Sequence, residues 1–300
     1  MRLKIIILIL AVLAFLSVSI GSALYYYSFR TAAFEKNQAD AAARLNLLSD
    51  QLSTHLSEHI KSVKALSGIR ELRYALLNTS LETLYQANQI LDLFTASLDL
   101  EVSYLIDSSG VTLCSSNRNE KDSFVGHDFS FRPYFQAARN ATAATYLALG
   151  STSNVRGVYY AHPVFDGYTG TVIGVAVMKA AVEPVEKRLF SGYEDVLMFV
   201  SPEGMIFISN QTELVFDLLW EITEEEADRL VDSRQFGNGP WEWSGFFKKD
   251  QTNVIDADNE KYLIAQREVT HYPGGKLSAS ENIKRLNVWS RNRLPGYWVR

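Results

Sequence analysis

Two stretches of the sequence share one pattern: VSYLIDSSGVTLCSSN at residues 102–117 and DVLMFVSPEGMIFISN at residues 195–210. Each has an apolar run, a short turn that ends in glycine, a second apolar run, and then serine and asparagine. Gly110 and Gly204 are 94 positions apart, and so are Ser115 and Ser209. Apolar runs on either side of such a turn predict a β-hairpin. The repeat predicts a duplicated module that is built on an antiparallel sheet.

The segments around the two hairpins alternate between strand and helix patterns. Strands are predicted at 144–150, 157–165 and 169–180 in the first module, and at 241–247 and 261–269 in the second. Short helices are predicted near 133–139, at 182–190 and at 223–230. The last of these helices begins with Thr223 as N-cap and Glu226 as the partner in a capping box. The predicted fold class is α+β, with two tandem antiparallel-sheet modules preceded by helices.

An uncharged apolar run occupies residues 5–29 near the amino end. About 20 residues are enough for a helix to cross a bilayer. Arg2 and Lys4 place the amino end in the cytoplasm by the positive-inside rule, and three tyrosines at 25–27 are typical of a membrane interface. The run therefore predicts a membrane anchor with the rest of the chain outside the cytoplasm. A signal peptide cleaved near residues 21–23 is the alternative.

A long amphipathic helix is predicted directly after the anchor, because residues 31–66 contain neither proline nor glycine. Its apolar positions recur at steps of three and four; they are Leu45, Leu48, Leu52, Leu56, Ile60, Val63 and Leu66. Anchor and helix are expected to form one rod, and the stripe to face either a second copy or the chain's own domain. A second helix is predicted at about 80–97. The motif HLSEH at 55–59 matches a zinc-peptidase pattern, but it lies within the ordinary stripe, so we expect no metal site.

The composition excludes several classes of protein. The net charge of -5 argues against nucleic acid as a partner, because phosphate binding needs a clustered basic face. A single cysteine, Cys114, excludes an intrachain disulfide and a cysteine-rich metal centre. The sequence has no nucleophile elbow and no phosphate-cradling glycine loop. We therefore expect neither a catalytic domain nor a cofactor in this chain.

Three motifs in order carry a family resemblance: FSFRPYFQAA at 129–138, ALGSTSNVRGVYYAHPV at 148–164 and GVAVMK at 174–179. They resemble the extracytoplasmic sensor region of C4-dicarboxylate sensor histidine kinases. The resemblance covers about residues 1–270. It implies a double Cache domain, in which two PAS-like sheets stand in tandem on a long amino-terminal helix. It also implies that the anchor lies in a bacterial inner membrane.

The resemblance and the patterns together divide the chain into five parts. We expect the cytoplasmic amino end and anchor at 1–30, the helical segments at 31–98, a membrane-distal module at 99–190, a membrane-proximal module at 191–275 and a basic tail at 276–300. The tail has no apolar run. The chain is therefore expected either to stop before a second membrane span or to be truncated there.

Two cations lie in the resembling stretch. Arg132 offers a planar fork of donors that matches a carboxylate. Lys179 ends an apolar strand, where an ammonium must meet either solvent or an anion. In the family, the arginine of the R-x-Y-F element and the lysine that ends this strand contact the ligand's carboxylates. The resemblance assigns those roles to Arg132 and Lys179, although Arg132 could pair with an aspartate instead and Lys179 could extend to solvent.

Neutral groups complete the expected site. Hydroxyl donors come from Ser151, Thr152 and Ser153, and flat walls from Tyr134, Tyr159 and Tyr160, of which only one of the two adjacent tyrosines can face the pocket. Asp166 reads as a turn residue. However, amino-acid-binding Cache domains hold the ligand's ammonium with an aspartate near this position, so an amino acid remains an open alternative to a dicarboxylate.

The function predicted from the sequence is that of a membrane-anchored sensor that binds a small carboxylate and signals across the membrane. The input half of a two-component sensor histidine kinase is the first expectation, with a homodimer formed through the long helix. The input domain of a chemoreceptor or diguanylate cyclase and a stand-alone binding protein are the alternatives.

Overall fold

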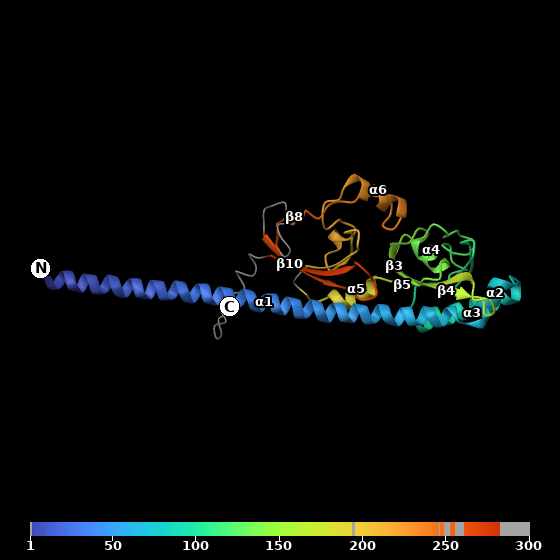
Figure 1. The fold of residues 1–300 in the computed structure, drawn as a ribbon, viewed down its shortest axis with the longest axis horizontal. Coiled ribbons are helices and arrows are strands. Elements are labelled where there is room, and N and C mark those ends of the chain that lie inside the picture. The colour runs from blue at the N-terminus through green and yellow to red at the C-terminus, as the bar shows by residue number, and fades with distance from the viewer. Residues whose placement is uncertain (1, 194–195, 246, 249–252, 256–260, 283–300) are drawn as a thin grey trace.

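The structure of the chain, a computed structural model, describes residues 2–193, 196–245, 247–248, 253–255 and 261–282. One long helix runs beside two antiparallel sheets, which follow each other along its length (Figure 1). The sheet nearer the helix's amino end comes later in the sequence. The predicted α+β class with a long amino-terminal helix and two sheet modules is confirmed.

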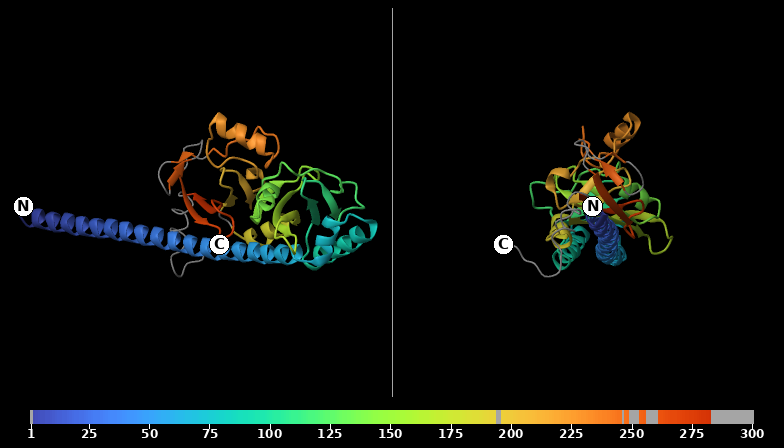
Figure 2. Two further views of the ribbon diagram at one scale, coloured as in Figure 1. Left: turned by 45° about the vertical axis from the view of Figure 1, so that its right-hand side comes forward. Right: turned by 90° about the vertical axis from the view of Figure 1, so that its left-hand side faces the viewer.

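Helix α1 (Arg2–Ser67) is continuous, so the predicted rod is confirmed. Its first half projects beyond the sheets (Figure 2), and its apolar side chains there are exposed. Among the described residues, this is the one helix long and apolar enough to cross a membrane. The second half packs against strands of both sheets and buries the leucine stripe from Leu45 to Leu66. The stripe therefore faces the chain's own domain.

Two shorter helices, α2 (Arg70–Leu77) and α3 (Leu81–Ser97), fold back at the far end of α1. α3 begins at a reciprocal cap in which the Ser80 and Thr83 side chains each accept a backbone N–H of the other residue. It then packs along β1 (Val102–Asp107) and β2 (Thr112–Ser115). The sequence predicted α3 and missed α2.

The first sheet, called the distal sheet because it lies farther from the amino end of α1, has the strand order β2-β1-β5-β4-β3. Its strands are β1 (Val102–Asp107), β2 (Thr112–Ser115), β3 (Ala144–Leu149), β4 (Arg156–Phe165) and β5 (Val172–Ala181). All pairs are antiparallel. Helix α4 (Pro133–Arg139) packs against β3, β4 and β5, and α1 packs against β4 and β5. Side chains that alternate along β4 and β5 therefore face either α1 or α4.

The second sheet, called the proximal sheet because it lies nearer the amino end of α1, has the order β7-β6-β11-β10-β9-β8. It follows helix α5 (Glu183–Phe190) and contains β6 (Val196–Val200), β7 (Ile206–Ser209), β8 (Phe247–Lys248), β9 (Asn253–Ile255), β10 (Lys261–Glu268) and β11 (Lys276–Asn282). The 3-10 helix η1 (Thr212–Leu214) and helix α6 (Glu224–Ser233) lie between β7 and β8. The Thr223–Glu226 capping box of α6 forms as predicted.

The two repeated hairpins, β1–β2 and β6–β7, have the same pairing. Tyr104 pairs with Ser115 in the first, and Met198 pairs with Ser209 in the second, 94 positions later. Both registers shift at the same step, and both turn glycines have positive φ, 104° at Gly110 and 90° at Gly204. Each hairpin forms one edge of its sheet. The repeat in the sequence thus corresponds to a repeat in three dimensions.

Two expectations for the second module need correction. The proximal sheet does not end at residue 275, because β11 (Lys276–Asn282) lies between β6 and β10 inside it. The strand predicted at 241–247 is largely absent, since 241–245 form only an isolated bridge at Trp243 and β8 begins at Phe247. The part of the expected basic tail at 283–300 lies outside the described residues.

Candidate ligand-binding site

Arg132 sits at the start of α4 and points into the protein. It precedes Pro133, which disfavours helical backbone at the residue before it, and its φ and ψ of -71° and 129° are extended. Its side chain is buried, with the residue only 1% exposed. The guanidinium donates to the backbone carbonyls of Leu149 and Arg234, each at 3.1 Å. The pairing with an aspartate that the sequence left open is not what the structure shows.

Lys179, near the end of β5, is also buried, and its ammonium does not extend to solvent. Nζ forms an ion pair with Glu101 and donates to Ser153 Oγ at 2.9 Å. The aliphatic stem lies over Gly157, where an added Cβ would be 2.5 Å from Cε of Lys179. An added Cβ at Gly150 would be 3.3 Å from Nζ. Two glycines therefore leave the space that the lysine fills.

The two cations approach one short piece of chain. Arg132 donates to the carbonyl of Leu149, and the next residue, Gly150, lies against the Lys179 ammonium. Lys179 pairs directly with Tyr159 on the neighbouring strand, so both side chains are on the face of the sheet that α4 covers. Arg132 reaches the same face from α4. Positive charge from positions 132 and 179 thus gathers on one side of the distal sheet.

Tyrosine rings line this cluster. Tyr159 stacks on Tyr134 with ring centroids 5.3 Å apart, and the Tyr134 hydroxyl is 2.8 Å from that of Tyr104. Tyr146 packs against Tyr134 at 6.0 Å, and its hydroxyl oxygen is buried with no hydrogen-bond partner among the described residues. Burial raises the pKa of Tyr134 and Tyr159, so both hydroxyls are neutral donors at neutral pH.

Five further predicted site residues lie at the cluster or in its loop. Ser153 contacts Lys179, whereas Ser151 on the same loop is exposed and Thr152 is half-buried. Tyr134 and Tyr159 form the stacked wall described above. Of the three consecutive hydroxyl residues, Ser153 is therefore the one that contacts Lys179.

Tyr160 and Asp166 are not part of the cluster, which corrects two site assignments. Tyr160 faces the opposite side of β4, where it stacks on His59 of α1 with centroids 5.0 Å apart. Adjacent strand residues point to opposite faces, so Tyr159 excludes Tyr160. Asp166 lies in the β4–β5 turn, roughly 20 Å along the strand from Tyr159. There its carboxylate accepts from Tyr168 N–H and from the Thr169 hydroxyl.

Several groups in the cluster were not predicted from the sequence. Glu101, one residue before β1, is the anionic partner of Lys179. The carbonyl of Arg234, from the end of α6 in the proximal part of the chain, accepts from Arg132. An acid before an apolar strand and a carbonyl in a distant loop carry no local signal. Tyr104 and Tyr146 would have been found by extending the face of Tyr159 across the sheet.

Burial dominates the electrostatics of the ion pair. It lowers the pKa of Lys179 and raises that of Glu101, and in each case the partner's charge opposes the effect. Glu183 and Asp122 add negative potential at longer range. The balance leaves a compact site with two cations and one anion, all within a low-dielectric environment.

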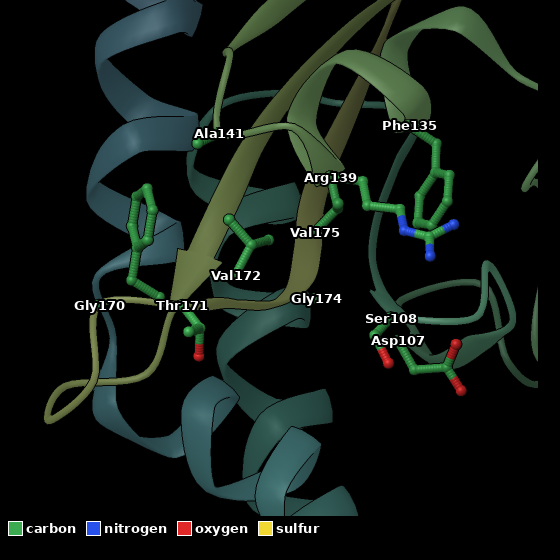
Figure 3. A pocket seen from close by; sticks show the side chains of 11 residues that line it. Asp107, Ser108, Phe135, Arg139, Ala141, Gly170, Thr171, Val172, Gly174 and Val175 are labelled. Atoms are coloured by element: carbon green, nitrogen blue, oxygen red, sulfur yellow. The ribbon is translucent and has the colours of Figure 1, made fainter.

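A hollow of about 420 Å³ lies at the other end of the same sheet face (Figure 3). Apolar side chains such as Phe135, Val172 and Val175 line most of it, and Arg139 of α4 stands at its side. Its size suits a small molecule. We nevertheless place the candidate site at Arg132 and Lys179, because buried charges with directed donors are what an anionic ligand requires.

Two known sensor proteins are similar to this chain in sequence. No family model matches the chain. The C4-dicarboxylate transport sensor protein DctB of Pseudomonas aeruginosa is 31% identical over 206 residues, which are 68% of this chain and 32% of that protein. DctB of Rhizobium meliloti is 33% identical over 169 residues, 56% of this chain and 27% of that protein. The chain thus spans about a third or less of these relatives.

Solved structures agree in fold. The sensor domain of the V. cholerae histidine kinase DctB gives a TM-score of 0.77 at 23% identity, covering 83% of this chain and 98% of that domain. The ligand-binding domain of the Campylobacter jejuni chemoreceptor Tlp3 in complex with L-valine gives 0.59 at 16% identity, covering 86% and 97%. The resemblance to C4-dicarboxylate sensor proteins stated from the sequence is confirmed, and the fold is that of their sensor domain.

Proposed function

We propose that this chain is the sensing portion of a membrane-anchored sensor histidine kinase that binds a small C4-dicarboxylate outside the cytoplasm. Its relatives are C4-dicarboxylate sensor proteins, and its apolar amino-terminal helix suits an anchor. Arg2 and Lys4 favour a cytoplasmic amino end, which would leave both sheets on the far side of the inner membrane. The distal sheet would form the binding module and the proximal sheet the module nearer the membrane.

The observation that carries the proposal is the pair of buried cations. Burying a charge is costly unless it is paired. Arg132 is paired in this structure only with carbonyl oxygens among the described residues, which are weaker acceptors than a carboxylate. A ligand carboxylate would therefore improve its partners. A second carboxylate on the same ligand would reach Lys179, with Ser153 and Tyr159 beside it.

A route for the signal follows from the contacts of α1. The helix packs on β4 and β5 behind the candidate site and on β10 and β11 of the proximal sheet. A shift of the distal sheet would therefore act on the helix that leads to the membrane. Such a shift requires that the ligand bind two conformations with different affinity. A homodimer through α1 stays a prediction, and it would have to use faces other than the buried leucine stripe.

The proposal predicts that Arg132→Ala weakens succinate or malate binding by at least about tenfold, because a charge-assisted bidentate pair is lost. Isothermal titration calorimetry on the full chain in detergent measures this. Arg139→Ala is the matched control, since it removes an exposed arginine from the same helix. Thermal unfolding of both variants checks that they fold, and Lys179→Met gives a second test of the same site. Unchanged affinity in the folded Arg132 and Lys179 variants would refute the assignment.

The input domain of a chemoreceptor is the second candidate, because chemoreceptor domains with bound amino acids share the fold. A thermal-shift comparison of neutral amino acids with dicarboxylates separates the two. If serine or valine raises the melting temperature of the protein and dicarboxylates do not, the chemoreceptor hypothesis is favoured.

A further inference from the structure

Glu101 stands where a ligand carboxylate is expected. Its Oε1 pairs with the Lys179 ammonium, whose side chain is 0% exposed, while the Glu101 side chain is 23% exposed. The backbone holds the pair together, because Glu101 N–H donates to the carbonyl of Lys179 at 2.9 Å. A ligand that reaches Lys179 must therefore meet Glu101 as well.

The second oxygen of this carboxylate has no hydrogen-bond partner in the described part of the chain. Glu101 Oε2 is buried and makes no hydrogen bond to any of the residues that the structure describes. A buried acceptor without a donor destabilises the protein, and it does so more strongly when it is charged. A donor from a ligand, above all a cationic one, would remove that cost. Among the residues that the structure describes, Glu101 Oε2 thus has no positive partner, and the hydrogen-bond partners of the Arg132 guanidinium are neutral carbonyls.

The charges at the cluster lead to the same requirement. Arg132 and Lys179 contribute two positive charges and Glu101 one negative charge, a sum of +1 for these three side chains. An unsubstituted dicarboxylate at neutral pH carries two negative charges and would leave the buried site negative. Its carboxylate at Lys179 would also lie beside that of Glu101 with no ligand ammonium to offset the repulsion, an arrangement that like charges disfavour. A dicarboxylate with one ammonium group carries a single negative charge and brings the sum to zero.

We propose that Glu101 makes this site selective for an acidic amino acid, a dicarboxylate that carries an ammonium group, over an unsubstituted dicarboxylate. The two ligand carboxylates bind Arg132 and Lys179, and the ligand ammonium donates to Glu101 Oε2. This inference rests on the proposed function of the same site and specifies the class of its ligand. Neutral amino acids are disfavoured because they lack the second carboxylate for two cations.

The test compares L-aspartate with succinate, which differ by the ammonium group, by calorimetry on the full chain in detergent at pH 7. Wild-type protein should bind aspartate at least about tenfold more tightly than succinate, the effect of one charge-assisted hydrogen bond. Glu101→Gln should reverse the order, because it keeps the shape but removes the anion that selects the ammonium. Asp122→Asn is the matched control: it removes a nearby negative charge that does not contact Lys179, and it should keep the wild-type preference.

Each outcome separates the two proposals. Equal or tighter binding of succinate by the wild type overturns the selectivity and leaves the sensor proposal standing. A Glu101→Gln variant that loses affinity for both acids to the same extent also overturns it. Failure of both acids to bind the wild type contradicts the proposed function, and the inference with it. The ratio of aspartate to succinate affinity is measured on wild-type protein. The proposal can therefore be refuted even if a variant fails to fold.

Discussion

At the scale of single residues, the position of Lys179 depends on the absence of a side chain at two neighbouring positions. Its stem crosses Gly157 on β4, and its ammonium ends beside Gly150. Any side chain at these two positions would occupy the same space. The glycines therefore serve close packing and not an unusual turn, and they fix where the ammonium can stand.

This packing predicts that Gly157→Ala displaces the lysine, since the new methyl would lie 2.5 Å from Cε. Overpacking of this kind costs about 1–3 kcal/mol of stability, and dicarboxylate affinity should fall by about tenfold or more. Gly174→Ala is a suitable control: its Cβ would lie 2.6 Å from Leu76 at the other end of the sheet. It should lose similar stability, measured by thermal unfolding, and keep affinity, measured by calorimetry. Equal affinity in both variants would show that the lysine does not hold the ligand.

The sequence predicts the cations of the site and misses the groups that pair with them. Arg132 and Lys179 lie in motifs with a family resemblance, so their role as candidate ligand contacts can be predicted from residue type and order. Glu101 lies outside those motifs, and its role depends on a buried contact with a residue 78 positions away. Tyr160 was included because alternation along a strand tells that one of two adjacent tyrosines faces the site, but not which one.

At the scale of elements, the seam between α1 and the sheets holds the molecule together and contains two histidines of the HLSEH motif. Their rings are 4.4 Å apart, and His59 continues the stack onto Tyr160. No group of three or more potential metal ligands exists among the described residues. Through the stack of His59 on Tyr160, the motif takes part in helix–sheet packing in this structure.

The seam predicts a loss of stability in acid. Burial, followed by the charges of His59 and Arg188, lowers the pKa of His55 from 6.5 to about 4. A group with a depressed pKa stabilises the fold above its unfolded value, and that stability is lost as the pH falls from 6.5 through 4. After allowance for partial exposure, the loss should be about 1–2 kcal/mol. Thermal unfolding of the full chain between pH 7 and pH 4 measures it.

The matched variants for this pH dependence are His55→Gln and His127→Gln. The first should flatten the pH dependence of the melting temperature by removing the buried ring that resists protonation. The second removes an exposed histidine outside the seam and should leave the profile unchanged. An identical slope in wild type and His55→Gln would contradict the assignment.

Elements with a clear period were predicted well, and those without one were missed. The hairpins, α3, α4 and α6 have turn glycines, caps or apolar spacing in the sequence. β11 reads KLSASEN, which is too polar to predict a strand, although Leu277 and Ser278 are buried. Tertiary pairing with β6 and β10 decides its conformation, and local sequence does not.

At the scale of the whole molecule, the candidate site also borders a loop from the proximal half of the chain. The loop after α6 adds to the edge of the distal sheet, with Gln235 donating to the carbonyl of Leu147 at 2.7 Å and accepting from Leu149 N–H at 2.8 Å. Arg132 donates to the neighbouring carbonyl of Arg234. A ligand that draws the guanidinium toward its carboxylate would change a contact between the two halves, in addition to the contact of the sheet with α1.

The most direct test of the ligand-binding site is a crystal structure of the part of the chain that carries the two sheets, with an acidic C4 ligand bound. If the site is correctly assigned, carboxylate oxygens of the ligand should lie within about 3.2 Å of both the Arg132 guanidinium and the Lys179 ammonium, the range of direct hydrogen bonds. Density for the ligand in the hollow beside Arg139, with Arg132 still bonded to the carbonyls of Leu149 and Arg234, would contradict it.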